Sequence, residues 1–91
     1  MKKHLNIRVC GNVEGVGFRG SARLKAQSLD LKGFVRNEPD GSVYIEAEGE
    51  ELNLQKFLDW CRKGPSFAKV QEVSFEESLV KNYKQFVILV V

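Results

Sequence analysis

The stretch GFVRNEPDGSVYIEAE, residues 33–48, decides the fold because it has the pattern of a β-hairpin. Its first arm is the short strand-like run 33–37. Its second arm, residues 43–48, alternates apolar and polar side chains, which predicts a strand with one buried face. Between them lies Glu38-Pro39-Asp40-Gly41, a turn in which proline presets one backbone angle and glycine supplies a positive one. We therefore expect two paired strands near the middle of the chain.

A helix is expected on each side of this hairpin. The first runs from Phe18 or Arg19 to Leu29, where apolar residues recur at helical spacing. The second opens at Glu50 and Glu51, whose charges suit the helix dipole, and Gly64-Pro65 end it. The expected apolar stripes are Phe18, Ala22, Ala26 and Leu29 in the first helix, and Leu54, Phe57, Leu58 and Cys61 in the second.

Three further strands lie outside the two helices. Alternation from Leu5 to Cys10 predicts a half-buried first strand, and Val70 to Phe75 predicts a fourth. Residues 83–91 predict a fifth, with the apolar run 86–91 as a buried terminal strand. The order βαββαβ, with one more strand at the end, predicts an α+β fold of the ferredoxin-like type: a sandwich with an antiparallel sheet of four or five strands and two helices on one face. Residues 1–91 are expected to form a single domain.

Composition narrows the classes of partner. A net charge of +2 over 91 residues does not indicate a dedicated nucleic-acid binder, although it leaves a local basic patch open. The run 86–91 is too short to span a membrane, and residues 1–4 lead into the first strand without a signal peptide. Cys10 and Cys61 have no metal-ligand spacing, so we expect free thiols in the cytoplasm.

The residues that most enzymes use are scarce. The one histidine, His4, stands at the start of the first strand and is expected to be an ordinary surface residue. No Ser-His-Asp or Cys-His system follows from the pattern, and no cluster has metal spacing, so neither a metal nor a cofactor is expected. The acidic pairs at 50–51 and 76–77 are expected to be solvated. Any chemistry must then rest on electrostatics and positioning.

The glycine-rich segment 11–19 is the best candidate for such chemistry. It joins a strand to the start of a helix, where backbone N–H groups lack partners, and Gly15 and Gly17 free the backbone to turn those donors toward an anion. Arg19 is unfavourable to the helix dipole there and lies four residues from Arg23, so a bidentate grip on phosphate would explain its presence. The other interpretation, a glycine-rich connection with a solvated arginine, is about equally compatible with the spacing.

Two segments resemble the signatures of the acylphosphatase family. Residues 9–19 are similar to its first signature, G-x-V-Q-G-V-x-F-R, and residues 33–37 are similar to the start of its second. Two departures are Glu14, where the family usually has Gln, and Asp30, where it often has Gly. Further matches to the family pattern are Gly41, Val43, Gly49, Gly64, Pro65, Ala68, Val70 and Val73.

This resemblance implies a metal-independent hydrolase that cleaves the carboxyl–phosphate bond of a small acyl phosphate without a cofactor. We expect it to be a monomer. It implies that Arg19 binds the phosphate and that Asn37 positions the attacking water. From the residues alone, Asn37 is more readily a turn residue that bonds its own backbone. The backbone N–H groups expected to bind phosphate are those of Glu14, Gly15, Val16, Gly17, Phe18 and Arg19.

Two alternatives stay open from the sequence. One is an RNA-binding ferredoxin-like module in which Phe34, Tyr44 and basic residues would supply stacking and charge. The other is a domain that binds anions without turnover. The carboxylate of Glu14 bears on the second alternative, because it would repel a phosphate if it faced the site. We expect it to point away and to bond the loop or solvent.

Overall fold

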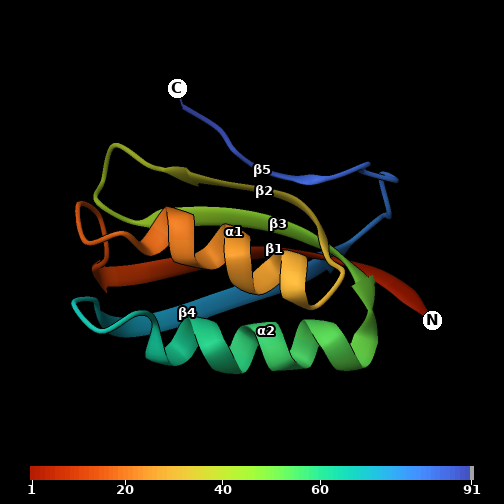
Figure 1. Ribbon diagram of the computed structural model, residues 1–91, viewed down its shortest axis with the longest axis horizontal. Helices are drawn as coiled ribbons and strands as arrows, with labels where there is room; N and C mark the ends of the chain where they lie inside the picture. Colours follow the sequence, from red (N-terminus) through yellow and green to blue (C-terminus); the bar gives the residue numbers. More distant parts are fainter. Residues whose placement is uncertain (91) are drawn as a thin grey trace.

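The computed structural model describes residues 1–90, in which two helices cover one face of a sheet (Figure 1). No helix in this part of the chain is long and apolar enough to cross a membrane. The α+β arrangement expected from the sequence is confirmed. The elements are β1 (Lys2–Asn12), α1 (Phe18–Ser28), β2 (Lys32–Asn37), β3 (Val43–Glu50), α2 (Glu51–Lys63), β4 (Lys69–Ser78) and β5 (Phe86–Ile88).

The strands of residues 1–90 form one five-stranded sheet in the order β4-β1-β3-β2-β5. Neighbours among β1 to β4 are antiparallel, as expected, but β5 is parallel to β2, with Val35 opposite Ile88. The expectation of an antiparallel sheet is therefore wrong for the last strand. The reason is the connection 79–85, which carries the chain from the β4 edge to the opposite edge and enters it in the direction of β2 (Figure 1).

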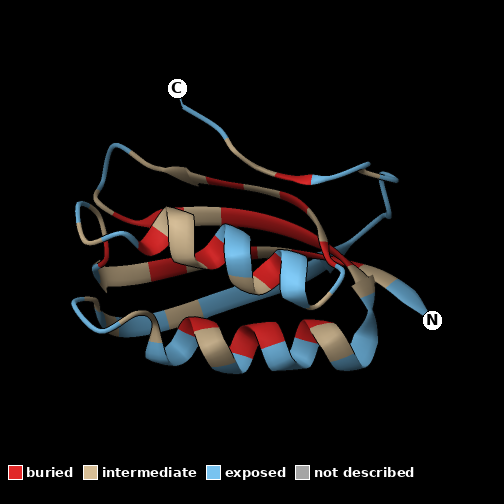
Figure 2. Cartoon of the chain, in the orientation of Figure 1, coloured by how far each residue is buried: buried red, intermediate tan, exposed pale blue. Residues whose placement is uncertain are grey.

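The hydrophobic core lies between the sheet and the helices (Figure 2). The stripe of α2 is buried as expected, whereas Leu29 at the end of the α1 stripe is only partly buried. Inward-facing strand residues and a few from the loops complete this core. Its buried members are Leu5, Ile7, Val9, Val13, Phe18, Ala22, Ala26, Leu31, Val35, Val43, Ile45, Ala47, Leu54, Phe57, Leu58, Cys61 and Phe86.

His4 is fully buried, so the expectation of an ordinary surface residue is wrong. Its Nδ1 lies 2.8 Å from Oε2 of Glu48, and its Nε2 lies 2.9 Å from Oδ1 of Asn6 and 3.0 Å from Oε1 of Glu46. All three partners come from outward positions of β1 and β3, on the face without helices. A buried polar cluster on this face requires a cover, because unpaired groups buried away from water are costly.

The cover is the connection that precedes β5. Glu48 accepts hydrogen bonds from the backbone N–H groups of Lys81 and Tyr83, and the Tyr83 hydroxyl donates to Glu46. Glu46 and Glu48 are consequently buried although they alternate with the core residues of β3. The expectation that β3 has only one buried face is wrong at these two positions.

The C-terminal strand is shorter than expected, since it spans Phe86–Ile88 instead of residues 83–91. Phe86 is buried against Phe57 of α2, with ring centroids 6.2 Å apart, but Leu89 and Val90 are exposed. The expectation of a wholly buried terminal strand is therefore wrong for these residues, and Val91 lies outside the described residues. An edge strand meets the core with alternate side chains only.

Both cysteines are free thiols, as expected. Cys61 belongs to the buried stripe of α2, and burial raises the pKa of its thiol to about 12. A thiol held in its neutral form is a poor nucleophile. Cys61 therefore serves packing.

Candidate active site

The loop between β1 and α1 is fixed at both ends by buried side chains. Val13 starts it and Phe18, the first residue of α1, ends it; both are about 1% exposed. The Phe18 ring lies 5.3 Å from the ring of Trp60, which anchors the start of α1 to α2. The loop lies at the same end of the molecule as the turn between β2 and β3 (Figure 1). The sequence thus holds the backbone of residues 14–17 in a defined position beside that turn.

Two glycines give this loop its shape. Gly15 has φ +75° and Gly17 has φ +80°, angles that other residues adopt only with strain. Gly17 is the N-cap of α1 and supplies no side-chain cap, and the first turn of the helix contains no acidic residue. The bond from the Ser21 N–H to the Gly17 carbonyl closes that turn. The N–H groups at the start of α1 are therefore without an anionic partner from their own helix, which is the arrangement that binds anions.

Arg19 lies in this first turn and lines a cavity of about 260 Å³. Its side chain is partly buried. No aspartate or glutamate of residues 1–90 lies within 4.0 Å of its guanidinium nitrogens. Its charge therefore adds to that of the helix N-terminus, and the two together favour an anion in the cavity.

Asn37, the last residue of β2, lines the same cavity. Its Oδ1 is buried and has no hydrogen-bond partner. The bonds of the turn that follows are made by others: the Glu38 N–H donates to the Ser42 carbonyl (2.8 Å), and the Ser42 N–H donates to Oδ1 of Asp40 (2.9 Å). Asn37 is thus not a turn residue that bonds its own backbone through Oδ1. An acceptor without a donor, buried beside Arg19, is an exception in folded proteins and indicates a missing ligand or water.

The family model described as Acylphosphatase matches residues 5–88. The chain belongs to the acylphosphatase family. It is 50% identical to an acylphosphatase of Archaeoglobus fulgidus over 82 residues, which cover 90% of this chain and 92% of that protein. It is 51% identical to one of Thermotoga maritima over 86 residues, with 94% and 96% covered. The crystal structure of the Bacillus subtilis acylphosphatase superposes with a TM-score of 0.95 at 38% identity, covering 99% of this chain and 100% of that one.

The residues implied by the family signatures are only partly gathered at the cavity. Gly15, Gly17, Phe18, Arg19 and Asn37 line it, whereas Glu14 and Val16 are not among its lining residues. Four further lining residues were not named as site residues from the sequence, although one of them, Val13, belongs to the segment 11–19. Of these, the glycine at position 20 carries a local signal, since glycine is unusual inside a helix, while the two from the C-terminal segment, one at the end of β5 and one beyond it, are distant in sequence. These four are Val13, Gly20, Ile88 and Val90.

Glu14, the departure inside the first signature, has its side chain partly buried and outside the cavity lining. Its Oε2 is buried and has no hydrogen-bond partner. The expectation that this carboxylate bonds the loop or solvent is therefore wrong for Oε2. The loop places this oxygen in an unsatisfied position, which destabilises the folded state.

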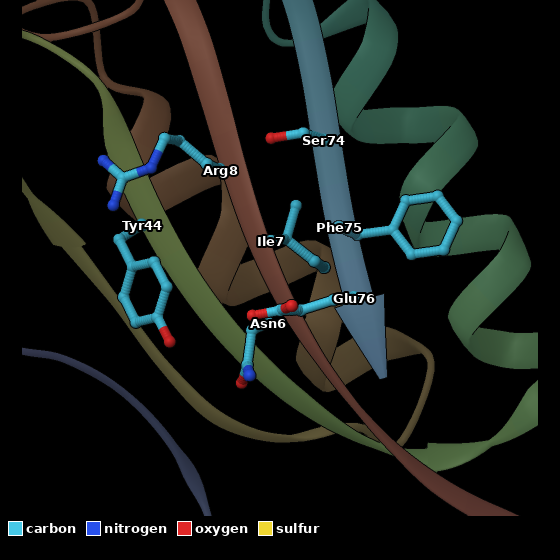
Figure 3. Close-up of a pocket in the computed structure, with 7 residues that line it drawn as sticks. All are labelled: Asn6, Ile7, Arg8, Tyr44, Ser74, Phe75 and Glu76. Atoms are coloured by element: carbon cyan, nitrogen blue, oxygen red, sulfur yellow. The ribbon is translucent and has the colours of Figure 1, made fainter. Parts of the chain in front are cut away.

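A second depression lies on the face of the sheet without helices, between β3, β1 and β4 (Figure 3). Two of its polar side chains already have partners: Arg8 donates to the Ser42 hydroxyl at 2.8 Å, and the Tyr44 hydroxyl donates to Glu46. Arg36 stacks over the Tyr44 ring at 4.9 Å. Because Arg8, the one cation in its lining among the described residues, already lies within 4.0 Å of Glu38 and Asp40, this depression is a weaker candidate for an anion site than the cavity of Arg19 and Asn37. In residues 1–90, no group of three or more His, Cys, Asp or Glu side chains could hold a metal ion.

Proposed function

We propose that this protein is an active acylphosphatase, which hydrolyses the carboxyl–phosphate bond of acyl phosphates to a carboxylate and inorganic phosphate. The observation that carries the proposal is the buried, unpartnered Oδ1 of Asn37 in the cavity that Arg19 also lines. Membership of the acylphosphatase family supports it. A cation and a free acceptor in one cavity match the two requirements of the reaction, which are an anion site and a held water.

The phosphoryl group would bind at the start of α1. The Arg19 guanidinium can donate to two phosphoryl oxygens, and the backbone N–H groups between Gly15 and Arg19 can donate to the others. Donors held by the fold in this way would stabilise charge on the phosphoryl oxygens in a loose transition state without reorganisation. Catalysis then comes from electrostatics and positioning, as expected where the cavity lining within residues 1–90 contains no histidine, cysteine or carboxylate.

Asn37 would hold the water that attacks phosphorus. The water donates a hydrogen bond to Oδ1, which keeps one of its lone pairs directed at the phosphorus atom. The new bond forms between water oxygen and phosphorus, and the bond from phosphorus to the acyl oxygen breaks with its electron pair on the carboxylate. A phosphoryl oxygen of the substrate takes the proton of the water. The carboxylate is a good leaving group and needs no general acid.

This mechanism uses no metal or cofactor, because Arg19 and the loop N–H groups stabilise the charge. All the residues it needs come from one chain, which supports a monomer with a small-molecule substrate. We propose that residues 1–91 act as one domain of this kind and bind no nucleic acid in doing so. The free thiols of Cys10 and Cys61 fit a reducing compartment such as the cytoplasm.

The test is release of inorganic phosphate from acetyl phosphate, measured with and without EDTA. Turnover well above the uncatalysed rate, unchanged by the chelator and competitively inhibited by phosphate, is expected. A rate equal to background would overturn the proposed function. Complete loss with EDTA and recovery with a divalent cation would overturn the metal-independent mechanism while leaving the activity.

A further inference from the structure

Gly20 is a glycine that the fold does not require. It lies in the first turn of α1, its backbone is not in the left-handed region, and a Cβ built on it would meet no atom within 4 Å. Gly15 and Gly17 are explained by their positive φ angles, but Gly20 is not. Glycine is also among the residues least favourable to a helix. Neither backbone conformation nor packing accounts for this residue, although it lines the same cavity as Arg19.

A side chain at position 20 would lean over that cavity. In an α-helix every Cα–Cβ bond is tilted toward the N-terminus. The cavity lies at the N-terminal end of α1, where Gly17 and Arg19 line it. The missing side chain therefore keeps the helix side of the cavity mouth open.

The opposite side of the cavity belongs to the sheet. Asn37 ends β2, and the parallel pairing of Val35 with Ile88, carried two residues further, brings Val90 beside Asn37. A bond from the Leu89 N–H to the Val35 carbonyl, 2.9 Å long, continues this pairing past β5. The side that carries Asn37 is thus walled by side chains, whereas three of the lining residues on the side of the loop and α1, Gly15, Gly17 and Gly20, have none.

In-line phosphoryl transfer gives these two sides different roles. The attacking water and the departing group lie on opposite sides of phosphorus. With the water at Asn37, the acyl carboxylate departs toward the loop and α1. There Gly15, Gly17 and Gly20 line the cavity without side chains, and a Cβ built on Gly20 would meet no atom within 4 Å. Room on this side is room for the acyl group.

We propose that Gly20 is a specificity-determining residue, which admits acyl phosphates with bulky acyl groups, aromatic or branched, by leaving the departure side open. This inference rests on the proposed function, because it requires the phosphoryl group at Arg19 and the water at Asn37. Gly20 itself touches neither the phosphoryl group nor the water. A larger residue there should therefore discriminate between acyl groups and leave phosphate binding unchanged.

The experiment compares two substrates, acetyl phosphate and benzoyl phosphate, across the wild type, Gly20→Ala and Gly20→Leu. Both substitutions are compatible with the fold, because their side chains have space and favour a helix more than glycine does. The control is Ser28→Leu, which adds the same side chain at the exposed far end of α1, away from the cavity. For each protein, kcat/KM for both substrates, the inhibition constant of inorganic phosphate and the melting temperature are measured.

Gly20→Leu is expected to lower kcat/KM for benzoyl phosphate about tenfold or more relative to acetyl phosphate, with a smaller shift for Gly20→Ala. In both Gly20 variants the inhibition constant of inorganic phosphate is expected to stay within about twofold of the wild-type value. In Ser28→Leu the ratio of the two kcat/KM values is likewise expected to stay within about twofold of the wild-type ratio. An active wild type whose substrate ratio is unchanged in Gly20→Leu would overturn the inference alone. Equal loss on both substrates, together with weaker phosphate inhibition, would also overturn it. A wild type that hydrolyses neither substrate would overturn the proposed function.

Discussion

The Nδ1 atom of His4 lies 2.8 Å from Oε2 of Glu48, and both side chains are fully buried. The same carboxylate accepts the backbone N–H groups of Lys81 and Tyr83, which belong to the connection that leads into β5. One buried charge therefore ties β1, β3 and this connection together. Removing this carboxylate is costly because the N–H donors that it satisfies are left without an equal partner in a place that water does not reach.

The protonation of this cluster links it to pH. Burial acts to raise the pKa of Glu48, but hydrogen bonds from the Lys81 N–H, from His4 and from the Tyr83 N–H outweigh it, so the pKa lies below its ordinary value. Burial likewise opposes a lower pKa for Glu46, and hydrogen bonds from the Lys81 ammonium and two tyrosine hydroxyls outweigh it. A carboxyl whose pKa is lower in the folded state stabilises the fold above its unfolded pKa. This contribution is lost as the pH falls through the folded pKa.

The free energy of unfolding is therefore expected to fall as the pH drops below the ordinary Glu value of 4.5. Glu48→Gln should cost about 1–3 kcal/mol at neutral pH and should then show a shallower acid loss than the wild type. Urea denaturation between about pH 3 and pH 7 measures both effects. The control is Glu76→Gln, an exposed carboxylate of β4. Parallel acid losses in the wild type and Glu48→Gln would contradict the role of this carboxylate.

The sequence predicted most of the fold because most helices and strands bury only one face, and hydrophobic periodicity identifies that face. The start of α1 at Phe18 and the stripe from Leu54 to Cys61 were both predicted, since these side chains meet a single core. Glu46 and Glu48 could not be, because a segment more than 30 residues away covers the other face of their strand. The alternation of apolar and polar residues predicts that such positions are exposed. No local sequence pattern indicates that a distant segment covers them.

The candidate site divides in the same way. Arg19 and Asn37 were expected from signature motifs, which are local, and both line one cavity. Ile88 and Val90 were not expected there, because the parallel pairing of β5 with β2 depends on the path of residues 79–85. The direction of the Glu14 side chain likewise depends on the conformation of the loop. The sequence alone does not determine that conformation, because the loop contains glycines that adopt positive φ angles.

Arg19→Gln is expected to weaken phosphate binding and turnover together. The substitution removes the charged donor of the site, and loss of such a contact costs about 2–5 kcal/mol. Competitive inhibition by inorganic phosphate measures the binding component. The matched control is Arg23→Gln, which removes an exposed arginine four residues along the same helix and outside the cavity. If phosphate inhibits Arg19→Gln as well as it inhibits Arg23→Gln, Arg19 does not bind the phosphoryl group.

Asn37→Ala is expected to lower kcat by about a hundredfold or more and to leave phosphate inhibition within a few-fold of the wild type. The reason is that Asn37 holds the water and not the phosphate. Stability should not fall through a lost hydrogen bond at Oδ1, because that atom has no partner in the fold. Asn12→Ala, an exposed asparagine at the end of β1, is the control. Equal losses of phosphate binding and turnover in a folded Asn37→Ala protein would show that its role is misassigned.

Glu14 is the residue most able to weaken the site. A carboxylate about 5 Å from a phosphate dianion, at an effective dielectric near 20, would repel it by about 6 to 7 kcal/mol. The side chain does not line the cavity, so its carboxylate is not expected to face an anion bound there, and solvent and salt would screen the remaining repulsion. Its Oε2, however, is buried without a hydrogen-bond partner, so Glu14 is expected to lower the free energy of unfolding and not the rate of the reaction.

Glu14→Gln is therefore expected to change KM by no more than several-fold and to raise the free energy of unfolding by about 1 kcal/mol or more. The gain arises because a neutral amide loses less than a carboxylate when its oxygen has no donor. Steady-state kinetics at two salt concentrations and urea denaturation measure the two effects on the same variant, with Glu14→Ala to remove the polar group altogether. A rise in kcat/KM of about a hundredfold, steeper at low salt, would instead mean that the carboxylate repels the substrate directly. In that case the side chain would turn into the cavity when the site is occupied, and its position outside the lining would describe only the free protein.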